Sequence, residues 1–237
     1  MSEVSNSTFS SVMVDSINYN QWVLSTFNAY ISKSVLELGI GHGEFCTFFK
    51  DKIDKYTGVD IDINLLEYAK QKYPNQHYYY GDITDVSFAK QLNDEKFDSF
   101  LCFNVLEHIQ DDKLAVQNML SVIKPNGYLL LFVPAFETLF SDLDRLAGHY
   151  RRYTKKTIKN LILPNQGKII RLEYFNSIGG IGWWLNKFTS HGSLESKMVH
   201  AQIRFFDKFV LPFSKVLNFA TRNFFGQSVL CVVQKNG

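Results

Sequence analysis

The sequence predicts an α/β fold built on a mostly parallel sheet, and three observations support this. Short apolar runs recur along the chain, at 34–38, 56–60, 77–80, 99–103, 128–133 and 168–174. Segments with apolar residues at helical spacing separate the runs, and such alternation is typical of parallel sheets. Three glycines directly follow the first run, at positions 39, 41 and 43, as expected where a parallel strand turns tightly into a helix.

The elements can be justified in order along the chain. Residues 1–33 contain Trp22, Leu24 and Phe27 at rough helical spacing, which predicts an N-terminal helical segment. Turn residues then mark two helix ends. Pro74 and Asn75 end the helix after the second run, and the stretch 124–127 separates another helix from the fifth run.

Composition excludes several classes of protein. The chain has 237 residues with 46% hydrophobic content, enough for one sizeable core with a small additional subdomain. No apolar stretch reaches the length of a membrane span, and the polar start MSEVSNSTFSS lacks a signal-peptide pattern, so we expect a cytoplasmic protein without a transmembrane segment. The cysteines, Cys46, Cys102 and Cys231, are far apart among apolar neighbours, which predicts buried thiols and no metal site.

Charge is distributed unevenly. The net charge is +2, but residues 1–144 carry 10 Lys and Arg against 20 Asp and Glu, whereas residues 145–237 carry 15 against 3. A basic C-terminal part favours an anionic ligand, a nucleic acid or an anionic membrane surface. Attraction between the two parts, or between subunits, is the alternative explanation.

The spacing of the glycines indicates which ligand lies against them. A dinucleotide fingerprint starting at Gly39 would need a glycine at position 44, where this chain has Glu44. Glu37, just before the loop, would repel a diphosphate but suits a cationic amino group. The loop therefore favours a cationic ligand over a pyrophosphate.

The stretch Glu37-Leu38-Gly39-Ile40-Gly41-His42-Gly43 resembles the first motif of class I S-adenosylmethionine-dependent methyltransferases of the type 11 and 12 groups. The resemblance implies a Rossmann-like sheet of seven strands, mostly parallel with an antiparallel last strand, and helices on both faces. It also implies S-adenosyl-L-methionine as cofactor and S-adenosyl-L-homocysteine as product. Glu37, Gly39, Gly41 and Gly43 would then line the cofactor.

Three further segments extend the resemblance over about residues 34–135. Asp60, followed by Ile61, matches the family's ribose-binding carboxylate, and Asp82 with Ile83 matches the position that holds the adenine edge. Asn104 begins a segment that resembles the one beneath the methionine moiety. In that segment His108 is a candidate catalytic residue, although a histidine after a strand is commonly structural.

The acceptor is expected beyond residue 135. His149, followed by the acceptor-site candidates Tyr150, Arg151, Arg152 and Tyr153, resembles a Gly-His-x-Arg-Arg-Tyr segment of bacterial type 11 and 12 methyltransferases. His149 is a candidate general base because its unperturbed pKa lies near neutrality. The adjacent arginines suit a phosphate or carboxylate, or equally an ion pair with Asp142 or Asp144.

The stretch 178–226 is a predicted helical insertion before the final strand, where the family needs only a short connection. It combines aromatic residues, Trp183 and Trp184 among them, with basic ones. Inward packing of the aromatics is one interpretation, and a lid over an apolar or lipid-linked anionic acceptor is the other. The predicted domains are thus the N-terminal segment 1–33, the cofactor-binding core 34–177, the insertion 178–226 and the final strand 227–237.

These inferences favour a methyltransferase acting on oxygen or nitrogen of a small or lipid-linked acceptor with an anionic group, with peripheral membrane contact compatible with the charge. RNA methylation is the chief alternative because the C-terminal part is basic. The segment Asn104-Val105-Leu106-Glu107 lacks the Asn/Asp-Pro-Pro-Tyr/Phe pattern of amino-methylating nucleic-acid enzymes, which excludes only some of them. A nicotinamide-dependent oxidoreductase is the remaining alternative.

Overall fold

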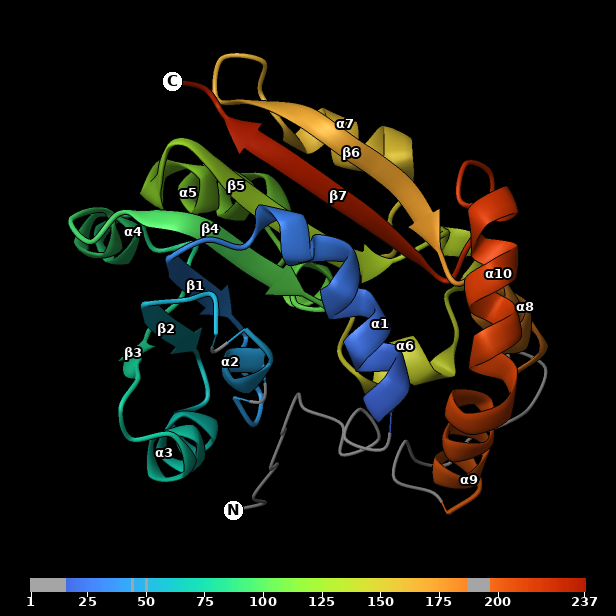
Figure 1. Ribbon diagram of the computed structural model, residues 1–237. Coiled ribbons are helices and arrows are strands. Elements are labelled where there is room, and N and C mark those ends of the chain that lie inside the picture. Colours follow the sequence, from blue (N-terminus) through green and yellow to red (C-terminus); the bar gives the residue numbers. More distant parts are fainter. Residues whose placement is uncertain (1–15, 44, 50, 187–196) are drawn as a thin grey trace, which may run out of the picture.

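The computed structural model describes residues 16–43, 45–49, 51–186 and 197–237, and it contains one seven-stranded sheet (Figure 1). The strand order is β3-β2-β1-β4-β5-β7-β6, and β7 runs antiparallel to both of its neighbours. The predicted fold class is therefore confirmed. The strands are β1 (Ser34–Leu38), β2 (Lys55–Asp60), β3 (His77–Tyr80), β4 (Phe97–Phe103), β5 (Ile123–Pro134), β6 (Gly167–Phe175) and β7 (Ser228–Lys235).

Helices cover both faces of the sheet, because the side chains of each buried strand alternate between two cores. In β1, Leu36 and Leu38 pack with α4, α5 and α7, whereas Val35 packs with α1. The described α-helices are α1 (Ile17–Phe27), α2 (Phe45–Phe48), α3 (Ile63–Lys72), α4 (Val86–Asn93), α5 (Asp112–Val122), α6 (Asp142–Leu146), α7 (Lys155–Leu161), α8 (Ser177–Asn186), α9 (Lys197–Phe205) and α10 (Leu211–Thr221).

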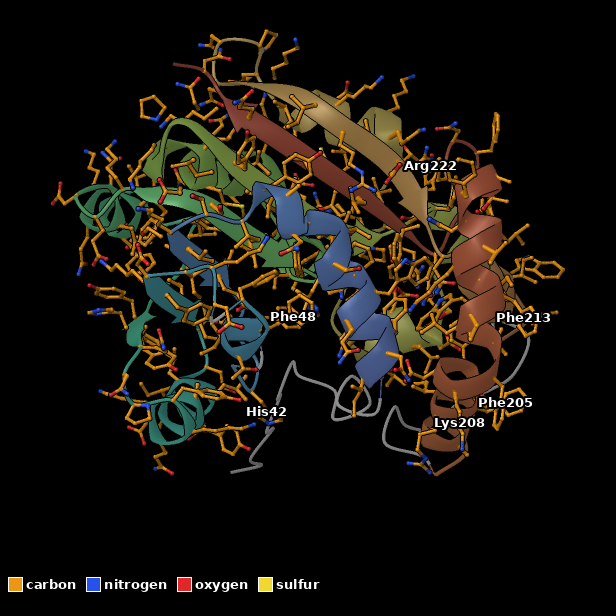
Figure 2. All side chains as sticks on the ribbon, viewed as in Figure 1. His42, Phe48, Phe205, Lys208, Phe213 and Arg222 are labelled. Atoms are coloured by element: carbon orange, nitrogen blue, oxygen red, sulfur yellow. The ribbon has the colours of Figure 1, made fainter. Side chains whose placement is uncertain are left out.

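The helices near the C-terminus lie beyond one edge of the sheet. Strand β5 pairs Pro134 with Ser228, so the antiparallel β7 begins where the parallel strands end. Helices α8, α9 and α10 connect β6 to β7 and therefore lie at that same edge (Figure 1). A five-residue π-helical turn, Phe206–Val210, joins α9 to α10 without a break. Figure 2 shows Phe205 and Phe213 extending from the outer side of this unit, away from the sheet.

Helix α1, which belongs to the N-terminal segment, contacts the insertion through Asp207. The carboxylate of Asp207, in the π-helical turn, accepts the backbone N–H of Asn18 at 3.1 Å and that of Tyr19 at 2.7 Å. These amides belong to the first turn of α1, where backbone donors lack partners inside the helix. Asp207 therefore caps α1, and Trp22 of α1 packs on Phe175 at the end of β6, with ring centroids 4.0 Å apart.

Some boundaries differ from those that the sequence predicts. Strand β5 starts at Ile123, so it includes the turn residues 124–127, and Asn126 adopts a positive φ of 64° there. Cys102 and Cys231 are buried free thiols in β4 and β7, as expected, and the side chain of Cys46 lies outside the described residues. Among the described residues, no helix is both long and apolar enough to span a bilayer.

Candidate active site

The glycine loop lies at the carboxyl end of β1, at the point between β1 and its parallel neighbour β4 where the strand order reverses. Gly39, Gly41 and Gly43 have φ values of +70°, +50° and +69°, which residues with side chains rarely adopt. At Gly39 an added Cβ would also lie 2.3 Å from Val105, in the loop after β4. The loop therefore depends on glycine for its backbone conformation and packs tightly against the next segment.

Glu37 lies just before this loop, one residue before the carboxyl end of β1. Its carboxyl group is 4% exposed and accepts a hydrogen bond from the hydroxyl of Tyr56 in β2. Burial raises the pKa of Glu37 to about 8, and the nearby Asp60 carboxylate adds to the rise. Such a carboxyl group suits a cationic partner, because an ammonium group beside it would favour the ionised carboxylate.

Asp60 ends β2 and lies next to the loop. It is buried, and burial raises its pKa. Backbone N–H groups hold its carboxylate: that of Asp62 at 2.9 Å, together with those of Gly41 and Ile61. The following side chain, Ile61, is 62% exposed, so an apolar surface lies beside a fixed carboxylate. That pair of features fits a ribose and an adenine ring.

A cavity of about 830 Å³ begins at Ile61, past the ends of β2 and β3. Asp82 lines it, and its carboxylate is oriented by the backbone N–H of Thr84 at 2.8 Å. The side chain of Ile83 is instead buried in the core, so only its backbone can face a ligand. The lining residues are Ile61, Tyr80, Gly81, Asp82, Asp85, Ser87, Phe88 and Gln91.

The loop after β4 brings polar groups to the same edge of the sheet. Asn104 has φ of +53° and donates its backbone N–H to Phe132 at 2.7 Å. A 3₁₀ turn, Leu106–His108, follows. Burial raises the pKa of Glu107 to about 7, and one of its carboxylate oxygens has no hydrogen-bond partner. Burial and the neighbouring His149 lower the pKa of His108 to about 4, so this imidazole is neutral at physiological pH.

His149 is held from behind by a buried ion pair. Its Nδ1 lies 2.9 Å from Oδ1 of Asp144, at the same carboxylate that Arg152 binds through Nε at 2.8 Å and through a terminal nitrogen at 3.0 Å. Burial alone would raise the pKa of Asp144, but His149 and Arg152 hold it well below its usual range. An ionised Asp144 therefore favours the proton on Nδ1 and leaves Nε2 as the basic nitrogen.

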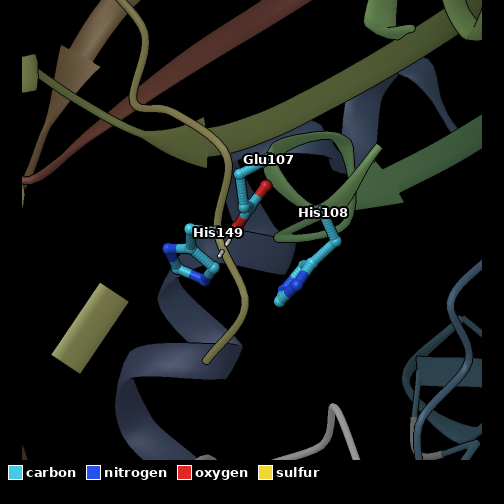
Figure 3. A group of neighbouring side chains, drawn as sticks. All are labelled: Glu107, His108 and His149. Carbon is cyan, nitrogen blue, oxygen red and sulfur yellow. Dashed lines mark ion pairs between the residues drawn. The ribbon is translucent and has the colours of Figure 1, made fainter. Parts of the chain in front are cut away.

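Figure 3 shows that Glu107, His108 and His149 converge, with the first two coming from the loop after β4 and the third from the loop after α6. Nε2 of His149 lies 4.0 Å from Glu107, and the two imidazole rings are edge to face with centroids 4.6 Å apart. One ligand atom from each residue lies within 4.8 Å of the others, so this set could hold either a proton or a metal ion.

The two arginines that sequence analysis assigns to the acceptor have partners of their own. Arg151 pairs with Asp112 at 3.0 Å and donates to the carbonyl of Gln110 at 2.7 Å. The side chain of Arg152 is 2% exposed and forms a buried ion pair with Asp144. This is one of the two pairings that the sequence left open. The Arg152 guanidinium therefore cannot reach an acceptor anion, and this part of the expectation needs correction.

Tyr153 also lies in the core. Its hydroxyl donates toward the carbonyl of Leu106 at 3.1 Å and the carboxylate of Asp112 at 3.0 Å. It supports the loop that carries Glu107 and His108, and it does not line an acceptor site. Tyr150, in contrast, is exposed beside the catalytic candidates, and its backbone N–H donates to the carbonyl of Glu107 at 2.8 Å.

The insertion reaches this site through Trp183 of α8. The guanidinium of Arg152 lies 4.9 Å from the centre of the Trp183 ring, a cation–π contact. Trp184, the next residue, is half exposed. The sequence pattern indicates no chemical role for Glu107, and it suggests Asp144 only as an ion-pair partner. Glu107 lies in the turn after β4 and Asp144 in α6, and only the fold reveals that both lie against His149.

A family model described as a methyltransferase domain matches residues 36–131, which include the glycine loop, Asp60, Asp82 and the Glu107–His108 turn. Among curated proteins, the ubiquinone biosynthesis O-methyltransferase of Haemophilus ducreyi is 28% identical over 124 residues, 50% of this chain and 52% of that protein. The demethylmenaquinone methyltransferase of Paenarthrobacter aurescens is 25% identical over 126 residues, 51% of this chain and 48% of that one. The chain thus spans about half the length of the curated relatives it matches.

Solved structures share the whole fold. A SAM-dependent methyltransferase from Archaeoglobus fulgidus matches with a TM-score of 0.62 and 18% identity, covering 92% of this chain and 93% of that one. The N-methyltransferase NodS of Bradyrhizobium japonicum, in complex with S-adenosyl-L-homocysteine, matches with a TM-score of 0.54 and 15% identity, covering 93% and 85%. Residues 36–131 therefore match a methyltransferase domain, and the sheet around them has the fold of solved S-adenosylmethionine-dependent methyltransferases.

Proposed function

We propose that this protein transfers a methyl group from S-adenosyl-L-methionine to a hydroxyl oxygen of a small or lipid-linked acceptor. The observation that carries the proposal is a juxtaposition: the glycine loop and Asp60 end β1 and β2, and the His149 cluster lies at the end of the adjacent β4. In parallel sheets these ends share one edge, so a cofactor in the loop has its reactive end near that cluster.

In this proposal the residues of the N-terminal part hold the cofactor. The Asp60 carboxylate accepts hydrogen bonds from both ribose hydroxyls, and Ile61 packs on the adenine ring. Asp82 and the backbone of Ile83 bind the adenine edge. Glu37 stabilises the amino group of the methionine moiety, and Asn104 lies beneath that moiety. When bound, S-adenosyl-L-methionine supplies a methyl group already activated by the sulfonium charge, so positioning and exclusion of water provide much of the remaining catalysis.

His149 serves as the general base. Its Nδ1 faces the ionised Asp144, so Nε2 is free to accept the proton of the acceptor hydroxyl as the oxygen–methyl bond forms. The imidazolium produced lies between the Asp144 carboxylate and Glu107, which stabilise its charge. His108, neutral and in contact with His149, positions the ring and is the weaker candidate for direct proton transfer.

Oxygen is the favoured acceptor atom because the relative from H. ducreyi is by its name an O-methyltransferase of ubiquinone biosynthesis. The half-exposed Trp184 and the exposed Tyr150 are the proposed apolar contacts of the acceptor. Because Arg152 is buried, Arg151 is the arginine of the two that we propose to bind an anionic group of the acceptor. Its side chain is 33% exposed.

An isotope-transfer assay tests the proposal. Labelled S-adenosyl-L-methionine is incubated with the protein and cell extracts separated into lipid, small-metabolite and RNA fractions. We expect label in the lipid or metabolite fraction as an alkali-stable methyl ether, lost with His149→Ala. Label found only in RNA would replace this proposal with RNA methylation, and binding of NAD(H) without label transfer would favour the oxidoreductase alternative.

A further inference from the structure

One surface of the molecule is apolar and faces away from the sheet. We call it the aromatic face, and it consists of exposed side chains on α9, the π-helical turn, α10 and the residues that follow. Phe213, Val216 and Phe219 on α10 are 71%, 77% and 76% exposed. The members of the aromatic face are Phe205, Phe209, Phe213, Val216, Leu217, Phe219 and Phe224.

The aromatic face is not the side by which the helix is held. The buried residues of α10 are Leu211 and Ser214, and polar bonds fix that side: the Ser214 hydroxyl donates to the Asn176 side chain at 2.6 Å. Asn218 accepts the backbone N–H of Asn176 at 2.8 Å. A surface helix ordinarily turns its apolar residues inward, so α10 presents the reverse arrangement. Large apolar side chains exposed together on one helical unit indicate a site of interaction.

The charges around the aromatic face are positive. Between residues 197 and 226 the chain has five Lys and Arg residues and one acid, Asp207. The Asp207 carboxylate is buried against the first turn of α1, so it does not reach the surface. Lys208 and Lys215 are exposed, and each lies over an aromatic ring, that of Phe209 and that of Trp22.

These charges argue against a second copy of the chain as the partner. A two-fold interface would place this basic surface of one copy against the same basic surface of the other, without a surface carboxylate in 197–226 to neutralise either. An anionic lipid surface is complementary to both features. Phenylalanine enters the boundary between headgroups and acyl chains, while lysine and arginine bind the lipid phosphates.

We propose that the aromatic face binds the surface of an anionic lipid bilayer. The binding is peripheral, with the helices α9 and α10 lying in the interface. The same subdomain contacts the candidate active site through Trp183, which lies against Arg152. A bound bilayer would therefore lie beside the acceptor end, where a lipid-linked acceptor could enter. Only this last step rests on the proposed function, and membrane binding stands without it.

Vesicle co-sedimentation of the whole chain tests the inference. We expect binding to vesicles that contain phosphatidylglycerol, weak binding to pure phosphatidylcholine, and loss of binding as salt is raised. Phe213→Ser combined with Phe219→Ser should lower the vesicle partition coefficient by about tenfold or more. Lys208→Gln with Lys215→Gln should lower it about tenfold on the anionic vesicles alone.

Phe48→Ser is the matched control, since Phe48 is an exposed aromatic residue on α2, away from α10 (Figure 2). This variant should bind vesicles like the parent, and thermal melting should show that every variant is folded. Failure of the parent to bind anionic vesicles overturns the inference, as does equal binding by the Phe213/Phe219 variant. Light scattering gives a third outcome that would contradict the inference. If the parent is a dimer and the Phe213/Phe219 variant is a monomer, the aromatic face is a contact between copies. None of these measurements depends on methyl transfer.

Discussion

The two ends of the candidate active site are built in different ways. The cofactor end uses backbone geometry and side chains that follow each strand directly: the positive-φ glycines after β1, and Asp60 at the end of β2. The acceptor end uses a network assembled from helix α6, the loop that follows it and the turn after β4, in which Arg152, Asp144, His149 and Glu107 are joined by charge. The first end is thus set by local sequence, and the second by long-range contacts.

This difference predicts unequal responses to substitution. At the acceptor end, removing one member of a buried charge network should affect stability as well as chemistry. At the cofactor end, removing an acid should affect ligand affinity with less effect on the fold. The predictions below begin with the largest expected effect, and the metal-removal test stands beside the His149 prediction that it complements.

Arg152→Met should destabilise the protein most. It leaves Asp144, which is fully buried, without its guanidinium partner, and breaking such a pair costs about 3–5 kcal/mol. Urea unfolding followed by circular dichroism measures the loss. Arg151→Met is the control, because its pair with Asp112 is partly exposed and should cost no more than about 1 kcal/mol. Equal losses of unfolding free energy in the two variants would show that the buried Asp144 network does not contribute more to stability than the partly exposed pair.

His149→Ala should lower kcat for a hydroxyl acceptor by about 10²–10³-fold, the contribution expected from a positioned base. Affinity for S-adenosyl-L-homocysteine should stay within about twofold, because the residue is proposed to touch the acceptor and not the adenosine. His77→Ala, an exposed histidine at the start of β3, should leave both quantities unchanged. A kcat for His149→Ala close to that of the parent would reject the general base.

Removal of metal ions separates the two uses of the His149 cluster. If His149 acts as a base, treatment with EDTA should leave methyl transfer unchanged. Loss of activity that returns with a divalent metal would instead assign Glu107, His108 and His149 as metal ligands. The parent protein should be assayed before and after dialysis against the chelator.

Asp60→Ala should weaken binding of S-adenosyl-L-homocysteine by roughly 1.5–3 kcal/mol, since it removes hydrogen bonds to a charged group. Asp62→Ala is the matched control: this neighbouring acid accepts the N–H of Asn64 and caps α3, and it is not proposed to touch the cofactor. Calorimetry on both variants distinguishes them. An affinity of Asp60→Ala equal to that of the parent would mean that Asp60 is misassigned.

Glu37 predicts that the affinity for the cofactor depends on pH. Its pKa of about 8 means that the free carboxyl is largely protonated at pH 6 to 7, whereas a bound ammonium group requires the carboxylate. Affinity for the cofactor should therefore rise between pH 6 and 7.5, by up to about tenfold per pH unit. Glu37→Gln should flatten the dependence, and a parent protein with no dependence would contradict the assignment.

The same contrast explains what could be predicted from the sequence. The strands and the positions of Gly39 and Asp60 follow from spacing along the chain, and the antiparallel last strand was implied by the family resemblance alone. The partners of Arg152 could not be chosen, because Asp142 and Asp144 are two residues apart and only the turn of α6 brings Asp144 inward. The role of Glu107 was invisible because its neighbour His149 is 42 residues away in the sequence.

A crystal structure with S-adenosyl-L-homocysteine tests the central claim, that the two ends meet around one reactive centre. We predict that the ribose hydroxyls bind Asp60, the amino group lies by Glu37, and the sulfur faces Glu107, His108 and His149. A ribose bound elsewhere, or a sulfur atom directed away from these three side chains, would contradict the account.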